Sequence, residues 1–226
     1  MTKYCVISHT HWDREWYMPF EQFRLKLVDL IDNLIEIIEE YPEYVFHLDA
    51  QTIVLEDYLE VRPSKKDILK KYIKAGNIIV GPWYMQNDFY LTSGESTVRN
   101  LIRGTKIAEE FGACGRVGYA PDQFGNISQL PQILRNFGID NFVFGRGYHE
   151  YSFDIEGNKR SFDTELPEFI VGDLTGSGIG GAKRVFKPAE FIWRGPDGSE
   201  LLAICMLYWY NNAQRFSENI DNSKLV

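Results

Sequence analysis

The sequence alternates between short apolar runs and amphipathic helical patterns, and this alternation most constrains the fold. Apolar residues spaced three and four apart predict helices over residues 19–41, 51–61, 64–75, 95–111 and 128–137. Apolar runs typical of strands cover residues 4–8, 44–48, 77–84, 116–120 and 141–145. Repeated βα units fold with parallel strands and outer helices. We therefore predict an α/β fold, with a mostly parallel sheet or an incomplete barrel surrounded by helices.

The pattern changes after residue 145. Residues 162–173 and 191–210 look extended, and the second stretch predicts a hairpin that turns at Gly195-Pro196-Asp197-Gly198. Asn222 and Ser223 resemble a helix N-cap only a few residues before the last one. We therefore expect residues 1–226 to be the N-terminal domain of a longer protein.

Composition narrows the class of protein. The net charge of −8 argues against a nucleic-acid partner, and no apolar run reaches membrane-spanning length. The three cysteines are far apart, which argues against a disulfide framework and favours a reducing compartment. The N-terminus has no signal-peptide pattern. We expect a cytoplasmic protein that binds neither membrane nor nucleic acid.

Polar side chains follow each predicted strand at the point where it ends. Active sites of parallel α/β folds lie at the carboxyl ends of the strands. Because these ends share one rim, we expect a cleft there that is rich in carboxylates and includes at least one cationic side chain. The rim residues are His9, His11, Asp13, Trp16, Asp49, Gln51, Trp83, Gln86, Asn87, Asp88, Asp122, Gln123 and Arg146.

The stretch SHTHWDREWY, residues 8–17, has the composition of a metal site. His11 and Asp13 are two residues apart, so both side chains can face one ion at a strand end. Imidazole and carboxylate suit Zn²⁺, which usually takes three or four protein ligands. Asp122 would face the pair, and His9 is an open alternative for a third ligand. The structural alternatives are a supporting role for one histidine and a turn or N-cap role for Asp122.

Other polar features have weaker functional signals. The stretch GSGIGG at 176–181 lacks the GK[ST] of a phosphate loop and predicts a flexible loop. His47 lies inside a predicted strand and His149 in a loop, so we expect structural or exposed roles. A metal-dependent amidohydrolase, which also uses an HxH motif, would need further histidines that these two are poorly placed to supply.

Four stretches of the chain, taken together in their order and spacing, resemble a known family. They are HTHWDREWY from His9, LDAQTIVLEDYLE from Leu48, GPWYMQNDFYLTSGES from Gly81 and YAPDQFGNISQLPQILRNFGIDNFVFGRG from Tyr119. The chain resembles glycoside hydrolase family 38, the zinc-dependent retaining α-mannosidases, and particularly its bacterial members. The resemblance covers most of residues 4–210.

The resemblance implies specific roles for individual residues. It makes His11 and Asp13 zinc ligands, and it makes Asp122 both a zinc ligand and the catalytic nucleophile. It places His9 outside the ligand set. In the family, the fourth zinc ligand, a histidine, and the general acid, an aspartate, come from later in the chain. The implied substrate-binding residues are Trp16, Arg146 and Phe124.

The resemblance also implies an activity. We expect residues 1–226 to be the N-terminal catalytic domain of a cytoplasmic Zn²⁺-dependent enzyme that hydrolyses terminal α-mannosidic bonds with retention. The isolated chain would lack the general acid and one zinc ligand. The substrate would be an α-mannoside or a mannosylglycerate, and homo-oligomerisation of the full-length enzyme stays open. The alternatives from other classes are a metal-dependent amidohydrolase or deacetylase, and a fragment that binds sugar or metal without catalysis.

Overall fold

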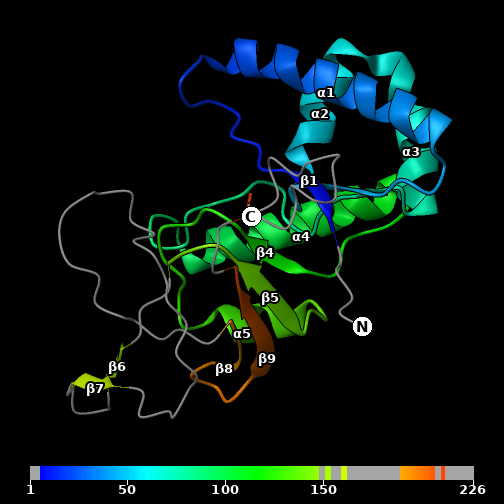
Figure 1. Cartoon of the computed structure of the whole chain (residues 1–226). Helices are drawn as coiled ribbons and strands as arrows, with labels where there is room; N and C mark the ends of the chain where they lie inside the picture. The colour runs from blue at the N-terminus through cyan, green and yellow to red at the C-terminus, as the bar shows by residue number, and fades with distance from the viewer. Residues whose placement is uncertain (1–5, 148–150, 154–158, 162–188, 207–209, 212–226) are drawn as a thin grey trace, which may run out of the picture.

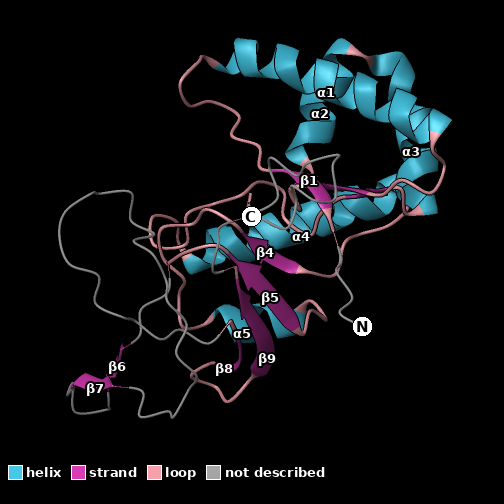
Figure 2. Ribbon diagram, in the orientation of Figure 1, coloured by secondary structure: helices cyan, strands magenta, loops and turns pink. Residues whose placement is uncertain are grey.

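The computed structural model describes residues 6–147, 151–153, 159–161, 189–206 and 210–211, and it has the predicted α/β architecture (Figures 1 and 2). The extended stretch 162–173, the loop 176–181, His149 and the N-cap at Asn222 all lie outside the described residues. The elements, in chain order, are β1 (Ser8–Thr10), α1 (Phe20–Glu40), β2 (Phe46–Leu48), α2 (Ile53–Val61), a 3₁₀ turn (Pro63–Lys65), α3 (Lys66–Ala75), β3 (Ile78–Ile79), α4 (Gly94–Phe111), β4 (Gly118–Ala120), α5 (Leu130–Asn136), β5 (Asn141–Phe144), β6 (Tyr151–Phe153), β7 (Lys159–Ser161), β8 (Glu190–Arg194) and β9 (Glu200–Cys205).

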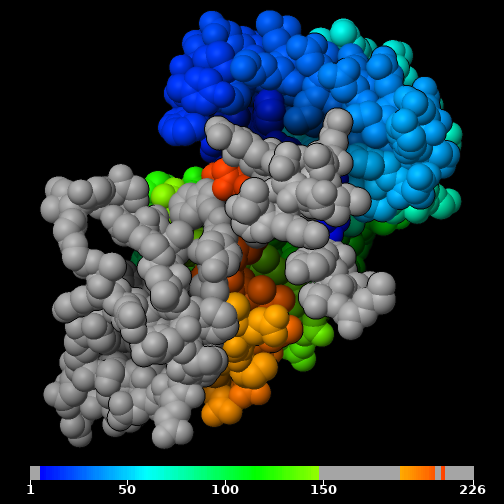
Figure 3. Space-filling model, viewed as in Figure 1, coloured from blue at the N-terminus to red at the C-terminus, as the bar shows by residue number. Residues whose placement is uncertain are grey.

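The first sheet is parallel and has the strand order β1-β2-β3. Ser8 pairs with Phe46, and Phe46 pairs with Ile78. Three helices, α1, α2 and α3, lie on one side of this sheet and form the blue and cyan lobe of the space-filling view (Figures 1 and 3). The apolar side chains of these helices and of β2 and β3 share one hydrophobic core.

The second sheet has the strand order β4-β5-β9-β8. Strands β4, β5 and β9 are parallel, whereas β8 pairs with β9 in the antiparallel sense. The β8–β9 hairpin confirms the turn predicted at residues 195–198, where Gly198 adopts a φ of 86° that glycine tolerates best. This sheet and α5 enclose a second hydrophobic core, so the part of the chain that the structure describes packs around two cores.

The helices form where the apolar spacing predicts them. Helix α1 buries seven side chains along one face, at positions 23, 27, 28, 31, 34, 35 and 38. Helix α3 ends at Gly76, whose φ of 87° closes the last turn. Helix α4 begins after Ser93, whose hydroxyl accepts a hydrogen bond from the Ser96 amide. None of the described helices combines the length and the apolar character needed to cross a bilayer.

Two strands differ most from their predicted limits. The first strand runs over Ser8–Thr10 rather than 4–8, and Val6 and Ile7 are exposed. Pairing with β2 determines where this strand lies, and Val6 and Ile7 before it do not take part. The third strand ends at Ile79 instead of residue 84, because Gly81 has a positive φ and Pro82 has no N–H to donate to a sheet. His9, predicted to follow the first strand, lies within it, whereas the other rim residues still follow their strands.

Side chains join the two sheets along a boundary that we call the seam. The indole N–H of Trp83, from the first sheet's side, donates to the carbonyl of Tyr119 in β4 (2.9 Å). The side-chain amide of Gln86 donates both to the Asp49 carbonyl (2.8 Å) and to the Tyr119 carbonyl (3.3 Å). The His47 ring meets the Tyr119 ring edge-on. The carboxyl ends of β1, β2 and β4 therefore lie close together.

Helix α4 holds the segment that forms the seam. The Tyr84 amide donates to the side-chain oxygen of Asn100 (2.7 Å). Gly104 lies so close that an added Cβ would be 2.1 Å from the carbonyl carbon of Trp83 and 2.3 Å from the oxygen of Pro82. Only glycine permits this approach of two backbones.

Candidate active site

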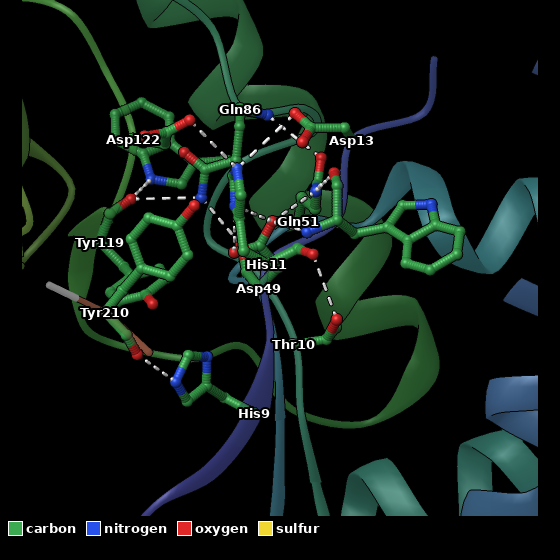
Figure 4. A network of polar contacts seen from close by, with 12 residues as sticks. His9, Thr10, His11, Asp13, Asp49, Gln51, Gln86, Tyr119, Asp122 and Tyr210 are labelled. Atoms are coloured by element: carbon green, nitrogen blue, oxygen red, sulfur yellow. Dashed lines mark hydrogen bonds and ion pairs between the residues drawn. The ribbon is translucent and has the colours of Figure 1, made fainter. Parts of the chain in front are cut away.

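The structure brings the three predicted metal ligands together at the seam (Figure 4). His11 directly follows β1, and Asp13 is two residues further on; Asp122 follows β4. The His11 Nε2 atom lies 3.6 Å from a carboxylate oxygen of Asp13 and 3.7 Å from one of Asp122. One imidazole nitrogen thus faces two carboxylates that come from different sheets.

These residues suit a zinc ion chemically. Bonds of about 2.0–2.2 Å in tetrahedral geometry leave neighbouring ligand atoms roughly 3.3–3.6 Å apart, close to the two distances at His11. In the described part of the chain the buried His11 Nε2 makes no hydrogen bond, as expected of an atom reserved for a metal. No three His, Cys, Asp or Glu side chains of the described ranges form a complete metal site as they stand. His11 Nε2 is the point that both carboxylates approach.

The other nitrogen of His11 faces a fully buried carboxylate. The Asp49 oxygens lie 3.2 and 3.3 Å from His11 Nδ1. Asp49 also accepts hydrogen bonds from the Trp12 amide (2.8 Å) and from the side-chain amide of Gln51 (2.8 Å). Burial raises the pKa of Asp49, and the hydrogen bond and charge of His11 counteract this increase.

Asp49 shifts the pKa of His11 in the opposite direction to burial. Burial of the ring lowers the pKa of His11, but the hydrogen bond with Asp49 and the charges of Asp49, Asp13 and Asp122 together raise it above the usual 6.5. The three carboxylates therefore favour the protonated ring in the protein without a metal, and a divalent cation at Nε2 would compete with this protonation.

Arg146 and Phe124 surround Asp122. The Arg146 guanidinium lies 2.7 Å from the Asp122 carboxylate and donates to the Asp122 carbonyl (2.9 Å). It also stacks over the Phe124 ring at 3.7 Å. Burial raises the pKa of Asp122, whereas Arg146 and His11 lower it. The sequence predicted this grouping, and the Asp122 side chain, at 26% exposure, stays accessible to a substrate.

Trp16 lies in the loop between β1 and α1, three residues after Asp13. It is 75% exposed and meets Tyr17 edge-on. An open pocket of about 480 Å³ lies alongside, and Trp16 is not among the residues that line it. The lining residues are His11, Trp12, Asp13, Arg14, Glu15, Phe20, Gln51, Met85 and Gln86. The structure therefore gives Trp16 a free ring face but leaves it outside this pocket.

An ion pair that the sequence did not reveal anchors the loop between β1 and α1. Arg14 donates twice to the nearly buried carboxylate of Asp57 in α2, at 2.7 and 2.8 Å. Its guanidinium also stacks on Phe20. A bidentate pair of this kind fixes orientation as well as distance. This pair holds the loop that carries Asp13 and Trp16. The sequence did not reveal it, because Arg14 and Asp57 are 43 residues apart and meet only in the folded chain.

His9 has a different environment from His11. Its Nε2 lies 2.7 Å from the carbonyl oxygen of Tyr210, and Figure 4 shows the ring apart from the three carboxylates. The Tyr210 ring in turn packs on His11 at 4.9 Å. His9 therefore tethers the chain beyond β9 to the site, and the structure gives no support to its alternative role as a third metal ligand.

Comparison with known proteins places this site in a family. Residues 1–225 match the description "Glycosyl hydrolases family 38 N-terminal domain". The chain belongs to glycoside hydrolase family 38. The resemblance expected from the four sequence stretches is therefore confirmed.

Individual members of the family agree with this assignment. The chain is 41% identical to a putative mannosylglycerate hydrolase of Halalkalibacterium halodurans, over 97% of the chain and 22% of the relative. It is 31% identical to an α-mannosidase of Saccharomyces cerevisiae, over 63% of the chain and 13% of the relative. The crystal structure of an α-mannosidase from Enterococcus faecalis V583 matches with a TM-score of 0.77 and 33% identity, over 97% of the chain and 22% of that protein. The chain thus spans about a fifth of the first two family members' length or less.

Proposed function

We propose that the protein carrying this chain is a zinc-dependent retaining glycosidase that hydrolyses terminal α-mannosidic bonds. The observation that carries the proposal is the convergence of Asp13 and Asp122 on His11 Nε2 at the seam of a family 38 fold. Relatives named α-mannosidase and putative mannosylglycerate hydrolase support the sugar class. Localisation in the cytoplasm and the oligomeric state remain separate expectations from the sequence.

Asp122 is the proposed nucleophile. The Arg146 guanidinium holds the carboxylate in place, and one of the Asp122 oxygens would attack the anomeric carbon. The bond from that carbon to the leaving oxygen breaks, an acid protonates this oxygen, and water later releases the sugar from Asp122 with retention. We propose that the acid comes from beyond residue 226, as in the family. Burial raises the pKa of Asp122, and the cationic Arg146 opposes this rise and so favours the ionised form of the attacking group.

His11, Asp13 and Asp122 are the residues that would hold Zn²⁺, with a further ligand from outside this chain. A bound Zn²⁺ ion supplies a Lewis acid that can hold sugar hydroxyls and stabilise the negative charge around them. The exposed rings of Trp16 and Phe124 are suited to pack against the C–H face of a sugar. The 41% identical relative favours a mannosylglycerate as a second candidate substrate.

The test uses the full-length protein and an aryl α-mannoside. Asp122→Asn keeps the size of the side chain but removes the nucleophile, and we expect turnover to fall by about three orders of magnitude or more. Asp67→Asn, an exposed carboxylate in the first turn of α3, is the matched control and should retain wild-type turnover. Near-normal turnover by Asp122→Asn would refute the nucleophile.

Two further measurements separate the remaining parts of the proposal. Activity that survives exhaustive chelation would exclude zinc, whereas loss with recovery on adding Zn²⁺ supports it. Comparing kcat/KM for mannosylglycerate and for plain α-mannosides decides between the candidate substrates. Mannose or zinc binding without any turnover by the full-length protein would instead favour a non-catalytic binding function.

A further inference from the structure

Asp49 has an environment built for an acceptor only. It is 0% exposed, and three donors converge on its two oxygens: the Trp12 amide, the Gln51 side-chain amide and His11 Nδ1. The orientation of the Gln51 side chain is fixed, because its nitrogen also donates to the Trp12 carbonyl and its oxygen accepts from the backbone N–H of Gln86. An ionised carboxylate satisfies all three donors, whereas an amide in its place would turn an N–H toward one of them.

The backbone at this position is unusual as well. Asp49 and Ala50 follow one another with φ values of 49° and 54°, a backbone conformation that residues other than glycine rarely adopt. A residue in this region is strained and persists only where its surroundings fix it. Here the Gln86 side chain holds the Asp49 carbonyl, and the Trp83 amide donates to the Ala50 carbonyl. Two successive strained residues thus turn the Asp49 carboxylate under the His11 ring.

This arrangement determines which nitrogen of His11 carries the proton. A neutral ring with a bare Nδ1 would put its lone pair against the Asp49 carboxylate, so Nδ1 must be the N–H. Nε2 is then the bare nitrogen, and it is the atom that Asp13 and Asp122 approach. A carboxylate that accepts from the distal N–H of a metal-binding histidine fixes the ring and makes the ligand more basic.

We propose that Asp49 is a positioning residue of the metal site, which holds His11 as the Nδ1–H tautomer and so presents Nε2 to Zn²⁺. This inference rests on the proposed function, because it requires His11 to be a zinc ligand. It does not make Asp49 a ligand or a catalytic residue, because Asp49 acts only through His11. The sequence places Asp49 on the rim but assigns it no role.

The first test measures the Zn²⁺ affinity of the full-length protein by competition with a chromophoric chelator. We expect Asp49→Asn to bind Zn²⁺ about 10–100-fold more weakly than wild type. Asp32→Asn is the matched control, since this carboxylate also accepts hydrogen bonds, from Tyr58 and Arg62, but lies between α1 and α2, with no contact to His11 among the described interactions. Its affinity should equal that of wild type. Purely structural roles for both carboxylates would lower the unfolding midpoint of each variant without this difference in affinity.

His11→Ala separates the two proposals. If it weakens Zn²⁺ binding while Asp49→Asn binds within twofold of wild type, the zinc site stands and the role of Asp49 is refuted. If neither variant changes the affinity, both proposals are refuted.

The second test needs no change at Asp49 and so remains decisive if Asp49→Asn does not fold. Histidine ring ¹⁵N shifts of the metal-free protein, recorded at a pH where His11 is neutral and assigned by loss of the signal in His11→Ala, report the tautomer directly. We expect the Nδ1–H form. A predominant Nε2–H form would overturn the proposal.

Discussion

The close contact between α4 and the segment before the site predicts that Gly104→Ala strongly destabilises the protein. The added Cβ would lie 2.1–2.3 Å from backbone atoms of Pro82, Trp83 and Tyr84, where ordinary contact begins at 3.4 Å. Helix and segment must therefore separate by roughly 1 Å, an overpacking that costs up to about 3 kcal/mol. The Trp83 hydrogen bond to Tyr119 would be weakened, which costs about 1 kcal/mol. The better helix propensity of alanine returns about the same amount.

We therefore expect the free energy of unfolding to fall by about 3 kcal/mol. Urea denaturation followed by tryptophan fluorescence measures this change, and with a slope of roughly 2–3 kcal/mol/M the midpoint should drop by about 1 M. Gly94→Ala is the matched control, because it makes the same substitution in the same helix with no atom within 4 Å of the new Cβ. It should stay within about 0.5 kcal/mol of wild type. A Gly104→Ala midpoint equal to that of Gly94→Ala would refute the reasoning.

Three further predictions concern stability. Burial and the nearby His9 lower the pKa of His47 to about 4, so below pH 6.5 the unfolded chain binds a proton that the folded chain does not. The free energy of unfolding should therefore fall by up to about 3 kcal/mol between pH 6.5 and 4. His47→Phe should remove this part of the pH dependence in thermal melts of the metal-free protein. Asp57→Asn, which leaves the Arg14 guanidinium without its carboxylate, should cost about 2 kcal/mol in urea denaturation, and a loss under 0.5 kcal/mol would contradict the anchoring role of the pair. Trp83→Phe keeps the buried ring but leaves the Tyr119 carbonyl without its indole donor, and calorimetry should show a loss of about 1–3 kcal/mol.

The sequence predicted the parts of the fold that depend on local patterns. The apolar spacing of residues 20–40 gives α1 within about a residue at each end, and the turn at 195–198 gives the hairpin. The limits of β1 were wrong because strand pairing, which is not local, decides them, and the limits of β3 were wrong because the run was continued through Gly81 and Pro82. The separation of β1-β2-β3 from β4-β5-β9-β8 was also hidden, since each strand signal is the same whichever neighbour the strand pairs with.

The candidate site was predictable to a similar degree. The rule that polar residues gather at the carboxyl ends of parallel strands brought His11, Asp13, Asp122 and Arg146 to one rim, and the family resemblance gave each a role. The partners of these residues were not predictable. Asp49 contacts His11 through a pair of positive-φ residues, a conformation that neither Asp nor Ala announces in a sequence.

The seam has a consequence for how the protein tolerates change. His11 and Asp13 follow a strand end of the first sheet and Asp122 follows a strand end of the second, so the distance between them depends on how the two sheets are placed relative to each other. Substitutions at Trp83 or Gln86, which hydrogen-bond from the first sheet's side to β4, can therefore alter the geometry of the site although neither residue is a proposed ligand.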